Sequence, residues 1–186
     1  MIILGVDPGT LITGYGVIEF RRGKLVMQTC DVIKNASNRS MPIRLKRIYD
    51  SLVAVIERYH PDEFAIETAF YGKNPQSALK IGHARGVAIL AAVNHQIPTA
   101  EYSPREVKKA VTGNGAASKQ QVSYMIRTQL QLREPPKYFD ASDALAVAVC
   151  HVSQILPGFP KYRTVPSTSK NQSWTRYVHE HPERIV

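Results

Sequence analysis

The sequence predicts an α/β fold, a mixed five-stranded sheet with helices on both of its faces. Three apolar segments near the N-terminus follow one another across short turns, which is typical of an antiparallel meander. Two later apolar segments are each reached only through a stretch of helical periodicity, which is how parallel strands are connected. Because this order of strands and helices buries the sheet on both sides, we expect helices on both faces.

The first predicted strand is an apolar run that ends on an acid. Ile2 to Val6 has the composition of a central strand, and Asp7 follows it directly before a Pro-Gly turn. The extended pattern resumes from Tyr15 to Ile18, so we expect a hairpin, and Lys24 to Ile33 is the third predicted strand. Burying an unpaired carboxylate at a strand end is costly. Asp7 is therefore either a turn-forming acid or a metal ligand whose partner carboxylates lie elsewhere.

A second strand that ends on an acid follows the first predicted helix. That helix begins near Ser40 and stops at His60, and Glu63 to Glu67 is the fourth strand. The longest helix is expected from Gln76 to His95, before a short fifth strand from Thr99 to Tyr102. Right-handed crossovers place the first and fourth strands side by side at the centre of the sheet. The two acids that end these strands should therefore be neighbours.

Two capping boxes predict where the next two helices begin. One box opens at Ser103 with a glutamate three residues later, and the other opens at Ser118 with a glutamine at the same spacing. Lys119 lies in the first turn of the second helix, where a cation opposes the helix dipole, so we expect it to serve something other than stability. The last helix is expected from Phe139 to Gln154.

Small residues recur along the Gln76–His95 helix. A row of small residues allows another backbone to approach closely. That backbone could belong to this chain's own sheet or to a second subunit. The row consists of Ala78, Gly82 and Gly86, and continues towards Ala88, Ala91 and Ala92.

Length and composition restrict the class of protein. The chain has 186 residues, of which 44% are hydrophobic, and this suits one domain with a full-sized core. No apolar run approaches the roughly 18 residues of a membrane helix. No basic segment precedes the first apolar run, so we expect no signal peptide. Cys30 and Cys150 have neither metal-binding nor disulfide spacing, which favours a reducing, cytoplasmic setting.

The charge indicates a polyanionic partner, and the C-terminal composition indicates a tail. The net charge is +9, of which residues 1–156 carry +6 and the last thirty residues carry +3. From Pro157 onward, prolines interrupt a polar run of Ser, Thr, Lys and Asn. We therefore expect one domain over residues 1–156 and a tail over residues 157–186, flexible or draped over the body.

Two further acids lie on the last predicted helix. Asp140 and Asp143 are three residues apart, so they share one helix face. Together with Asp7 and Glu67 they would place four carboxylates around one pocket. Two carboxylates about 5 Å apart repel by roughly 3 kcal/mol at an effective dielectric near 20. Such a cluster would be too costly without a cation.

Ligands of this kind favour a hard divalent cation and chemistry at phosphate. Oxygen donors without His or Cys suit Mg²⁺ or Mn²⁺. Two such ions about 3.5–4 Å apart are the usual arrangement for in-line displacement, one activating water and the other stabilising the leaving 3′ oxygen. A basic surface around an acidic pocket suits a nuclease, because lysines hold the nucleic-acid backbone while carboxylates hold metal.

The order of these motifs resembles one known family. From Met1 to about Ser153 the chain is similar to the RuvC family of bacterial Holliday junction resolvases, which belongs to the ribonuclease H-like superfamily. The residues after Pro157 match no motif of that family. The strand-end motif is weak alone, whereas the ordered set is specific. It comprises ILGVDPGT with TGYG, FAIE with Phe70 and Lys73-Asn74, SALK, ARGVA and DASDALA.

The resemblance implies a fold, an activity and a set of site residues. The fold is the ribonuclease H-like mixed five-stranded sheet flanked by helices, in a protein that acts as a homodimer. The activity is resolution of Holliday junctions in DNA recombination and repair, by paired symmetric nicks in strands of like polarity. A thymine-rich cutting preference and the RuvAB branch-migration complex as partner are also implied. Two catalytic Mg²⁺ ions, replaceable by Mn²⁺, would be bound by Asp7, Glu67, Asp140 and Asp143, and DNA would be contacted by Phe70, Lys108 and Lys119.

Other interpretations of the same residues stay open. Lys108 and Lys119 could be solvated lysines, and Phe70 could pack on its own domain. A catalytically inactive junction-binding protein would bind junctions without nicking them in Mg²⁺, although the presence of all four acids argues against it. A nucleotide-binding protein of the actin and sugar-kinase superfamily would also open with a strand, an Asp and a Gly-Thr turn. The short chain and the lack of a second such motif argue against that class, which nucleotide affinity would favour.

Overall fold

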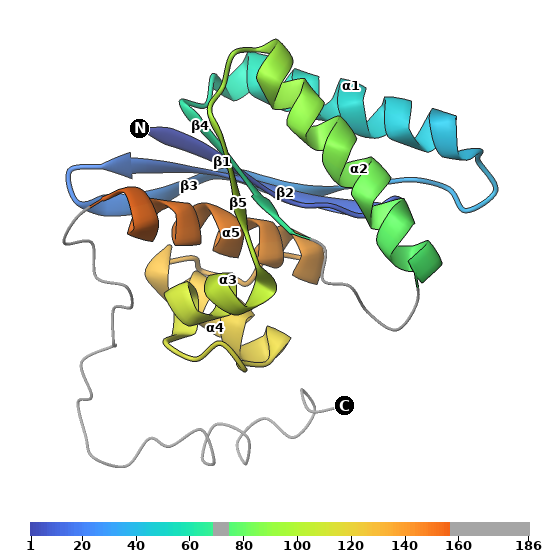
Figure 1. Cartoon of the computed structure of the whole chain (residues 1–186). Coiled ribbons are helices and arrows are strands. Elements are labelled where there is room, and N and C mark those ends of the chain that lie inside the picture. Colours follow the sequence, from blue (N-terminus) through green and yellow to red (C-terminus); the bar gives the residue numbers. More distant parts are fainter. Residues whose placement is uncertain (69–74, 157–186) are drawn as a thin grey trace.

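A computed structural model of the protein describes residues 1–68 and 75–156 (Figure 1). These residues form the predicted mixed five-stranded sheet, in the order β3-β2-β1-β4-β5, together with helices. The elements are β1 (Ile2–Asp7), β2 (Ile12–Arg21), β3 (Lys24–Lys34), α1 (Met41–Tyr59), β4 (Glu63–Glu67), α2 (Pro75–Asn94), β5 (Thr99–Tyr102), α3 (Pro104–Thr112), α4 (Lys119–Gln129) and α5 (Phe139–Ile155).

The pairing of the strands brings two acids to one edge of the sheet. β1 pairs with β2 in the antiparallel sense, with Asp7 opposite Gly14. On its other side β1 pairs with β4 in the parallel sense, with Val6 opposite Ile66. One step further along each of these strands lie Asp7 and Glu67, so the predicted neighbourhood of the two strand-ending acids is confirmed.

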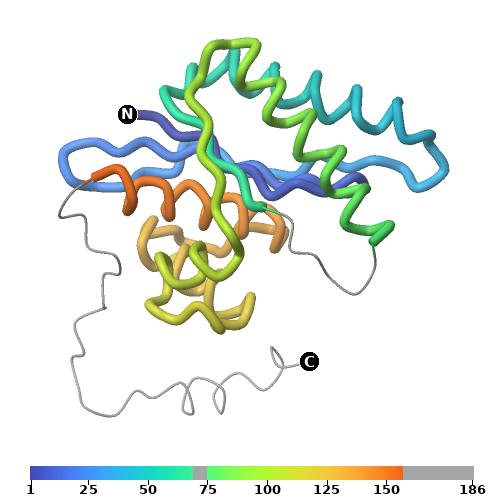
Figure 2. Tube along the Cα trace, viewed as in Figure 1, coloured from blue at the N-terminus to red at the C-terminus, as the bar shows by residue number. Residues whose placement is uncertain are grey.

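Different helices cover the two faces of the sheet, as Figures 1 and 2 show. α1 and α2 pack on one face, where Leu4, Val17 and Phe64 of the sheet are buried. α5 lies directly on the other face, over Ile3 and Ile18, and α3 and α4 pack against α5 on its far side. The prediction of helices on both faces is therefore confirmed.

α5 lies unusually close to the sheet because two strand residues lack a side chain. A Cβ atom on Gly5 would collide with the carbonyl oxygen of Ala144, and one on Gly14 would collide with the carbonyl oxygen of Asp140. Any larger residue at either position would have to push the helix away. The first turn of α5 is thus held against β2, beside the end of β1.

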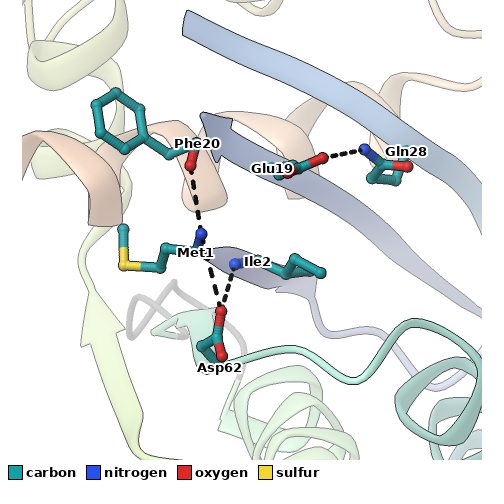
Figure 3. Close-up of polar contacts among 6 residues, drawn as sticks. All are labelled: Met1, Ile2, Glu19, Phe20, Gln28 and Asp62. Atoms are coloured by element: carbon teal, nitrogen blue, oxygen red, sulfur yellow. Dashed lines mark hydrogen bonds and ion pairs between the residues drawn. The ribbon is translucent and has the colours of Figure 1, made fainter. Parts of the chain in front are cut away.

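The opposite end of β1 is anchored by the polar contacts drawn in Figure 3. The backbone N–H of Ile2 donates to Oδ2 of Asp62 at 2.7 Å, and the amino group of Met1 donates to the carbonyl oxygen of Phe20 at 3.3 Å. Asp62 directly precedes β4. These bonds tie the starts of β1 and β4 to the end of β2, at the end of β1 far from Asp7.

Short sequence motifs correctly predicted where α3 and α4 begin. Ser103 and Ser118 form complete capping boxes at α3 and α4, as predicted. None of the helices in the described ranges combines the length and the hydropathy that a bilayer span requires. Phe70 and the tail from Pro157 lie outside the described residues.

The small residues of α2 divide between two faces of the helix. Ala88, Ala91 and Ala92 are buried in the core beneath α2. Gly82 and Gly86 have open space where a Cβ atom would lie. The reason is geometric, because a step of two residues turns an α-helix by about 200° and carries Ala88 to the side opposite Gly86.

Candidate active site

Asp7 and Glu67 form the centre of the site, at the carboxyl ends of the two central strands. Burial, with the charges of Asp143 and Asp140, raises the pKa of Asp7 to about 7. Burial and the charges of Asp7 and Asp143 raise the pKa of Glu67 to about 8. The two side chains share a hydrogen bond, and burial with the neighbouring charges favours a proton held between them when no cation is bound.

Asp143 approaches this pair from α5 and is joined to Lys119. Oδ2 of Asp143 lies 3.1 Å from Nζ of Lys119, and the two side chains are 18% and 62% exposed. Burial raises the pKa of Asp143 even though Lys119 acts in the other direction. Burial also disfavours the charge on Lys119, but the carboxylates around it outweigh that effect and raise the pKa of Lys119. The cation in the first turn of α4 therefore serves the acids, which explains its position against the helix dipole.

Asp140 and Lys108 complete the electrostatics of the site. Asp140 lies in the first turn of α5, where the close approach at Gly14 positions its backbone. Its charge contributes to the raised pKa of Asp7. Lys108, on α3, is near enough to Glu67 and Asp143 for its charge to offset part of the effect of burial on both pKa values. Four acids and two lysines from five elements thus act on one another.

The donor set fits a hard divalent cation, although the acids are not yet arranged as a cage. Within residues 1–68 and 75–156, no three Asp, Glu, His or Cys side chains converge closely enough to hold a metal ion. Burial is the largest cause of the raised pKa values of Asp7 and Glu67, and the neighbouring carboxylates raise them further. A cation would take the place of the shared proton, and carboxylate oxygens are the ligands that Mg²⁺ and Mn²⁺ prefer.

The structure also shows what sequence reasoning missed. The ion pair between Lys119 and Asp143 was not predicted, although a lysine placed against a helix dipole was a usable signal. The role of Gly14 in seating α5 was missed too. Its signal was the Gly-Tyr-Gly sequence inside a predicted strand, since glycine in a strand marks a close approach of another backbone. Phe70 lies outside the described residues.

Comparison with known proteins gives one consistent family. The family described as "Crossover junction endodeoxyribonuclease RuvC" matches residues 3–151. A protein of that name from Desulforamulus reducens is 52% identical over 151 residues, covering 81% of this chain and 93% of the relative. Another from Salinibacter ruber is 45% identical over 185 residues, covering 100% of this chain and 99% of the relative. The similarity to that relative therefore extends through the tail, beyond the motifs that end near Ser153.

Solved structures agree with the sequence comparison. Thermus thermophilus RuvC in complex with a Holliday junction substrate superposes with a TM-score of 0.78 at 32% identity, covering 83% of this chain and 94% of that one. The yeast mitochondrial Holliday junction resolvase Ydc2 superposes with a TM-score of 0.58 at 14% identity, covering 81% of this chain and 78% of that one. The second likeness shows the shared fold alone.

Proposed function

The chain belongs to the RuvC family of crossover junction endodeoxyribonucleases, and from this premise we infer that it cuts four-way DNA junctions at the acids of β1, β4 and α5. The observation that carries the inference is that Asp7, Glu67, Asp140 and Asp143 act electrostatically on one another, where burial and the neighbouring carboxylates raise the pKa values of Asp7 and Glu67. The presence of all four acids favours a catalyst over an inactive junction-binding protein.

RuvC nucleases depend on metal, and we propose that the four acids hold two Mg²⁺ ions, for which Mn²⁺ can substitute. When bound, divalent cations supply the positive charge that activates water and stabilises the leaving oxygen in phosphodiester hydrolysis. Asp7 and Glu67 would hold the cations in their ionised form, without the shared proton. Lys119 favours the ionised form of Asp143 and orients it through their 3.1 Å contact.

The reaction at each site is hydrolysis of one phosphodiester bond. A water oxygen attacks phosphorus, the bond to the 3′ oxygen breaks, and the departing oxygen takes up a proton. Lys108 and Lys119 contribute positive charge beside acids that would otherwise repel the DNA backbone. We propose that both lysines contact phosphates, so that DNA can approach an acidic site.

Phe70 is proposed to recognise the branched structure of the junction. It lies three residues beyond Glu67 in the sequence, although outside the described residues. An aromatic ring there could stack on a base freed at the crossover, an interaction of about 1–3 kcal/mol that continuous duplex cannot supply. Phe70→Ala should lose junction nicking much more than thermal stability. A variant that melts several degrees lower yet nicks at the normal rate would assign Phe70 to packing.

A homodimer is the proposed assembly, because a junction offers two equivalent strands and a two-fold enzyme can place one site on each. The outer face of α2 suits the contact. Leu79, Leu90 and Val93 on this helix are 63%, 50% and 53% exposed, and a Cβ atom on Gly82 or Gly86 would meet nothing. Paired symmetric nicks in strands of like polarity follow from such a dimer.

The wider setting is also proposed. Residues 1–156 would form the nuclease domain and residues 157–186 a tail, in a cytoplasmic protein that works with the RuvAB branch-migration complex during recombination and repair. The free thiols of Cys30 and Cys150 are compatible with a reducing compartment.

Asp7→Asn tests the proposed function. The variant should bind a four-way junction in chelator as the wild type does, because the lysines supply the affinity, yet it should lose nicking in Mg²⁺ by a hundredfold or more. Asp50→Asn is the matched control, since Asp50 is an exposed partner of Lys46 on α1. Nicking by Asp7→Asn at the wild-type rate would remove the acids from the reaction.

A further inference from the structure

A second cationic surface lies beside the acids, at the β3 edge of the sheet. We call it the β3-edge surface. It is formed by the turn before β2, the end of β3 and the start of α5. Its members are Leu11, Ile12, Lys34, Lys137, Tyr138 and Phe139.

Two ammonium groups share one aromatic ring on this surface. Nζ of Lys34 lies 4.0 Å from the ring centroid of Tyr138, and Nζ of Lys137 lies 5.5 Å from the same centroid. Across the described ranges, no carboxylate forms an ion pair with either lysine. Like charges gathered without an acid repel one another, so the arrangement favours an anionic ligand.

Exposed apolar side chains occur at positions next to the two lysines along the chain or across the sheet. Leu11 is 44% exposed, Ile12 is 42% exposed and Phe139 is 53% exposed. Apolar and aromatic side chains interleaved with lysines are typical of surfaces that bind nucleic-acid strands, where they contact sugars and bases while the cations contact phosphates.

An aromatic residue occupies the N-cap position of α5. Tyr138 is the N-cap of α5, and its side chain makes no capping hydrogen bond. Ser, Thr, Asp or Asn would be the usual capping residues at that position. α3 and α4 both have complete capping boxes. α1 also begins without a side-chain cap, but at α5 the N-cap residue presents its ring to two ammonium groups.

The β3-edge surface lies at the same end of the sheet as the candidate active site. Phe139 directly precedes Asp140, and the turn that contains Leu11 begins after Asp7. Lys34 pairs with Ile12 across β2 and β3. This surface reaches the acids from β2, β3 and the start of α5. Lys108 and Lys119, in contrast, reach them from α3 and α4. A strand held at the acids would thus have a cationic surface available on another flank.

We propose that the β3-edge surface binds the sugar-phosphate backbone of the DNA strand that passes through the acidic site. Lys34 and Lys137 contact its phosphates, and Phe139, Leu11 and Ile12 pack against its sugars. The inference rests on the proposed function, because the strand at the acids is what brings phosphates to this surface. A docked protein is the less favoured occupant. The feature that points to a partner is the position of the surface beside the candidate nuclease site, and that position favours DNA.

The test compares two double variants that remove equal charge. Lys34→Gln with Lys137→Gln alters the β3-edge surface. Lys24→Gln with Lys46→Gln is the control, because Lys24 begins β3 at its other end and Lys46 lies exposed on α1. Affinity for a labelled four-way junction is measured in chelator by fluorescence anisotropy over a series of salt concentrations. The first variant should flatten the slope of log affinity against log salt by about two units. It should bind about tenfold more weakly near 0.1 M salt, while the control keeps the wild-type slope.

Phe139→Ala provides a second reading that does not involve charge. It should weaken junction binding about fivefold and leave the salt slope unchanged, because a contact with sugars releases no counterions. The proposal would be overturned if the two double variants had equal slopes of log affinity against log salt and melting temperatures that show both to be folded. A protein partner would then be the favoured occupant of the surface. Nicking by the wild type in Mg²⁺ tests the proposed function separately, since the slopes are measured without metal.

Discussion

At the scale of single residues, the acids of the site carry a stability cost that depends on pH. Asp7 and Glu67 have pKa values raised to about 7 and about 8 from ordinary values of 3.8 and 4.5. Between about pH 4 and pH 8 the folded protein therefore binds more protons than the unfolded chain. The free energy of unfolding consequently falls as pH rises through this window, as long as no cation is bound.

Asp7→Asn should remove much of this dependence. In chelator at pH 8.5 the variant should melt several degrees higher than the wild type, since about 1 kcal/mol shifts the melting temperature by roughly 2–4 °C in a domain of this size. The difference should shrink as the pH falls towards 3.8, the ordinary pKa of Asp7. Comparing them cancels other titrating groups, such as His151, whose pKa is lowered mainly by burial. A wild type that melts higher than Asp7→Asn at pH 8.5 in chelator would contradict the electrostatic account.

Gly14 is the residue through which the fold and the chemistry are most tightly joined. In Gly14→Ala the added methyl group would meet the carbonyl oxygen of Asp140, so the first turn of α5 must move. We expect a destabilisation of about 2 kcal/mol from overpacking. We also expect a loss of nicking of about a hundredfold in the protein that remains folded, because small misplacements of catalytic groups are costly. Circular dichroism melting and junction nicking measure the two effects, and normal nicking by a destabilised variant would refute the link.

At the scale of elements, the helices and strands that short sequence motifs specify could be predicted from the sequence. The two capping boxes fixed the starts of α3 and α4, and acid-terminated apolar runs fixed β1 and β4. The ion pair between Lys119 and Asp143 could not be predicted, because it depends on how α4 packs against α5. The division of small residues on α2 could have been predicted from helix geometry alone.

The outer face of α2 is the proposed contact between the two subunits. Gly86→Trp should convert the proposed dimer into a monomer, because the open space above Gly86 would be filled by a large side chain. Light scattering after size-exclusion chromatography measures the mass. Ala54→Trp is the control, since Ala54 is an exposed small residue on α1 and its replacement should leave the mass unchanged. A wild type that is monomeric and still makes paired nicks would contradict the proposed interface.

At the scale of the whole molecule, the sheet order and the layering followed from the sequence, whereas the contribution of the tail did not. Strand order is set by the turns and crossovers between elements, which composition and periodicity reveal. Residues 157–186 hold none of the four acids, yet the relative from Salinibacter ruber is similar over the full chain. The tail's charge of +3 is compatible with a role in binding DNA.

Truncation after Leu156 tests the division into a domain and a tail. The shortened protein should fold, and it should nick junctions at the wild-type rate when enzyme is saturating. It should bind them a few-fold more weakly, because positive charge has been removed. Single-turnover nicking at several enzyme concentrations separates rate from affinity. A folded truncation that cannot nick at any concentration would place part of the chemistry beyond residue 156.

The central claim is that acids from β1, β4 and α5 cut a four-way junction with the help of divalent metal. The most direct measurement is to incubate the wild type with synthetic four-way junctions, each labelled on one strand, with and without Mg²⁺, and to map every nick. The account predicts nicks at symmetric positions in two strands of like polarity, only when Mg²⁺ is present. Nicks that persist in chelator, or a junction that is bound but left intact in Mg²⁺, would contradict it.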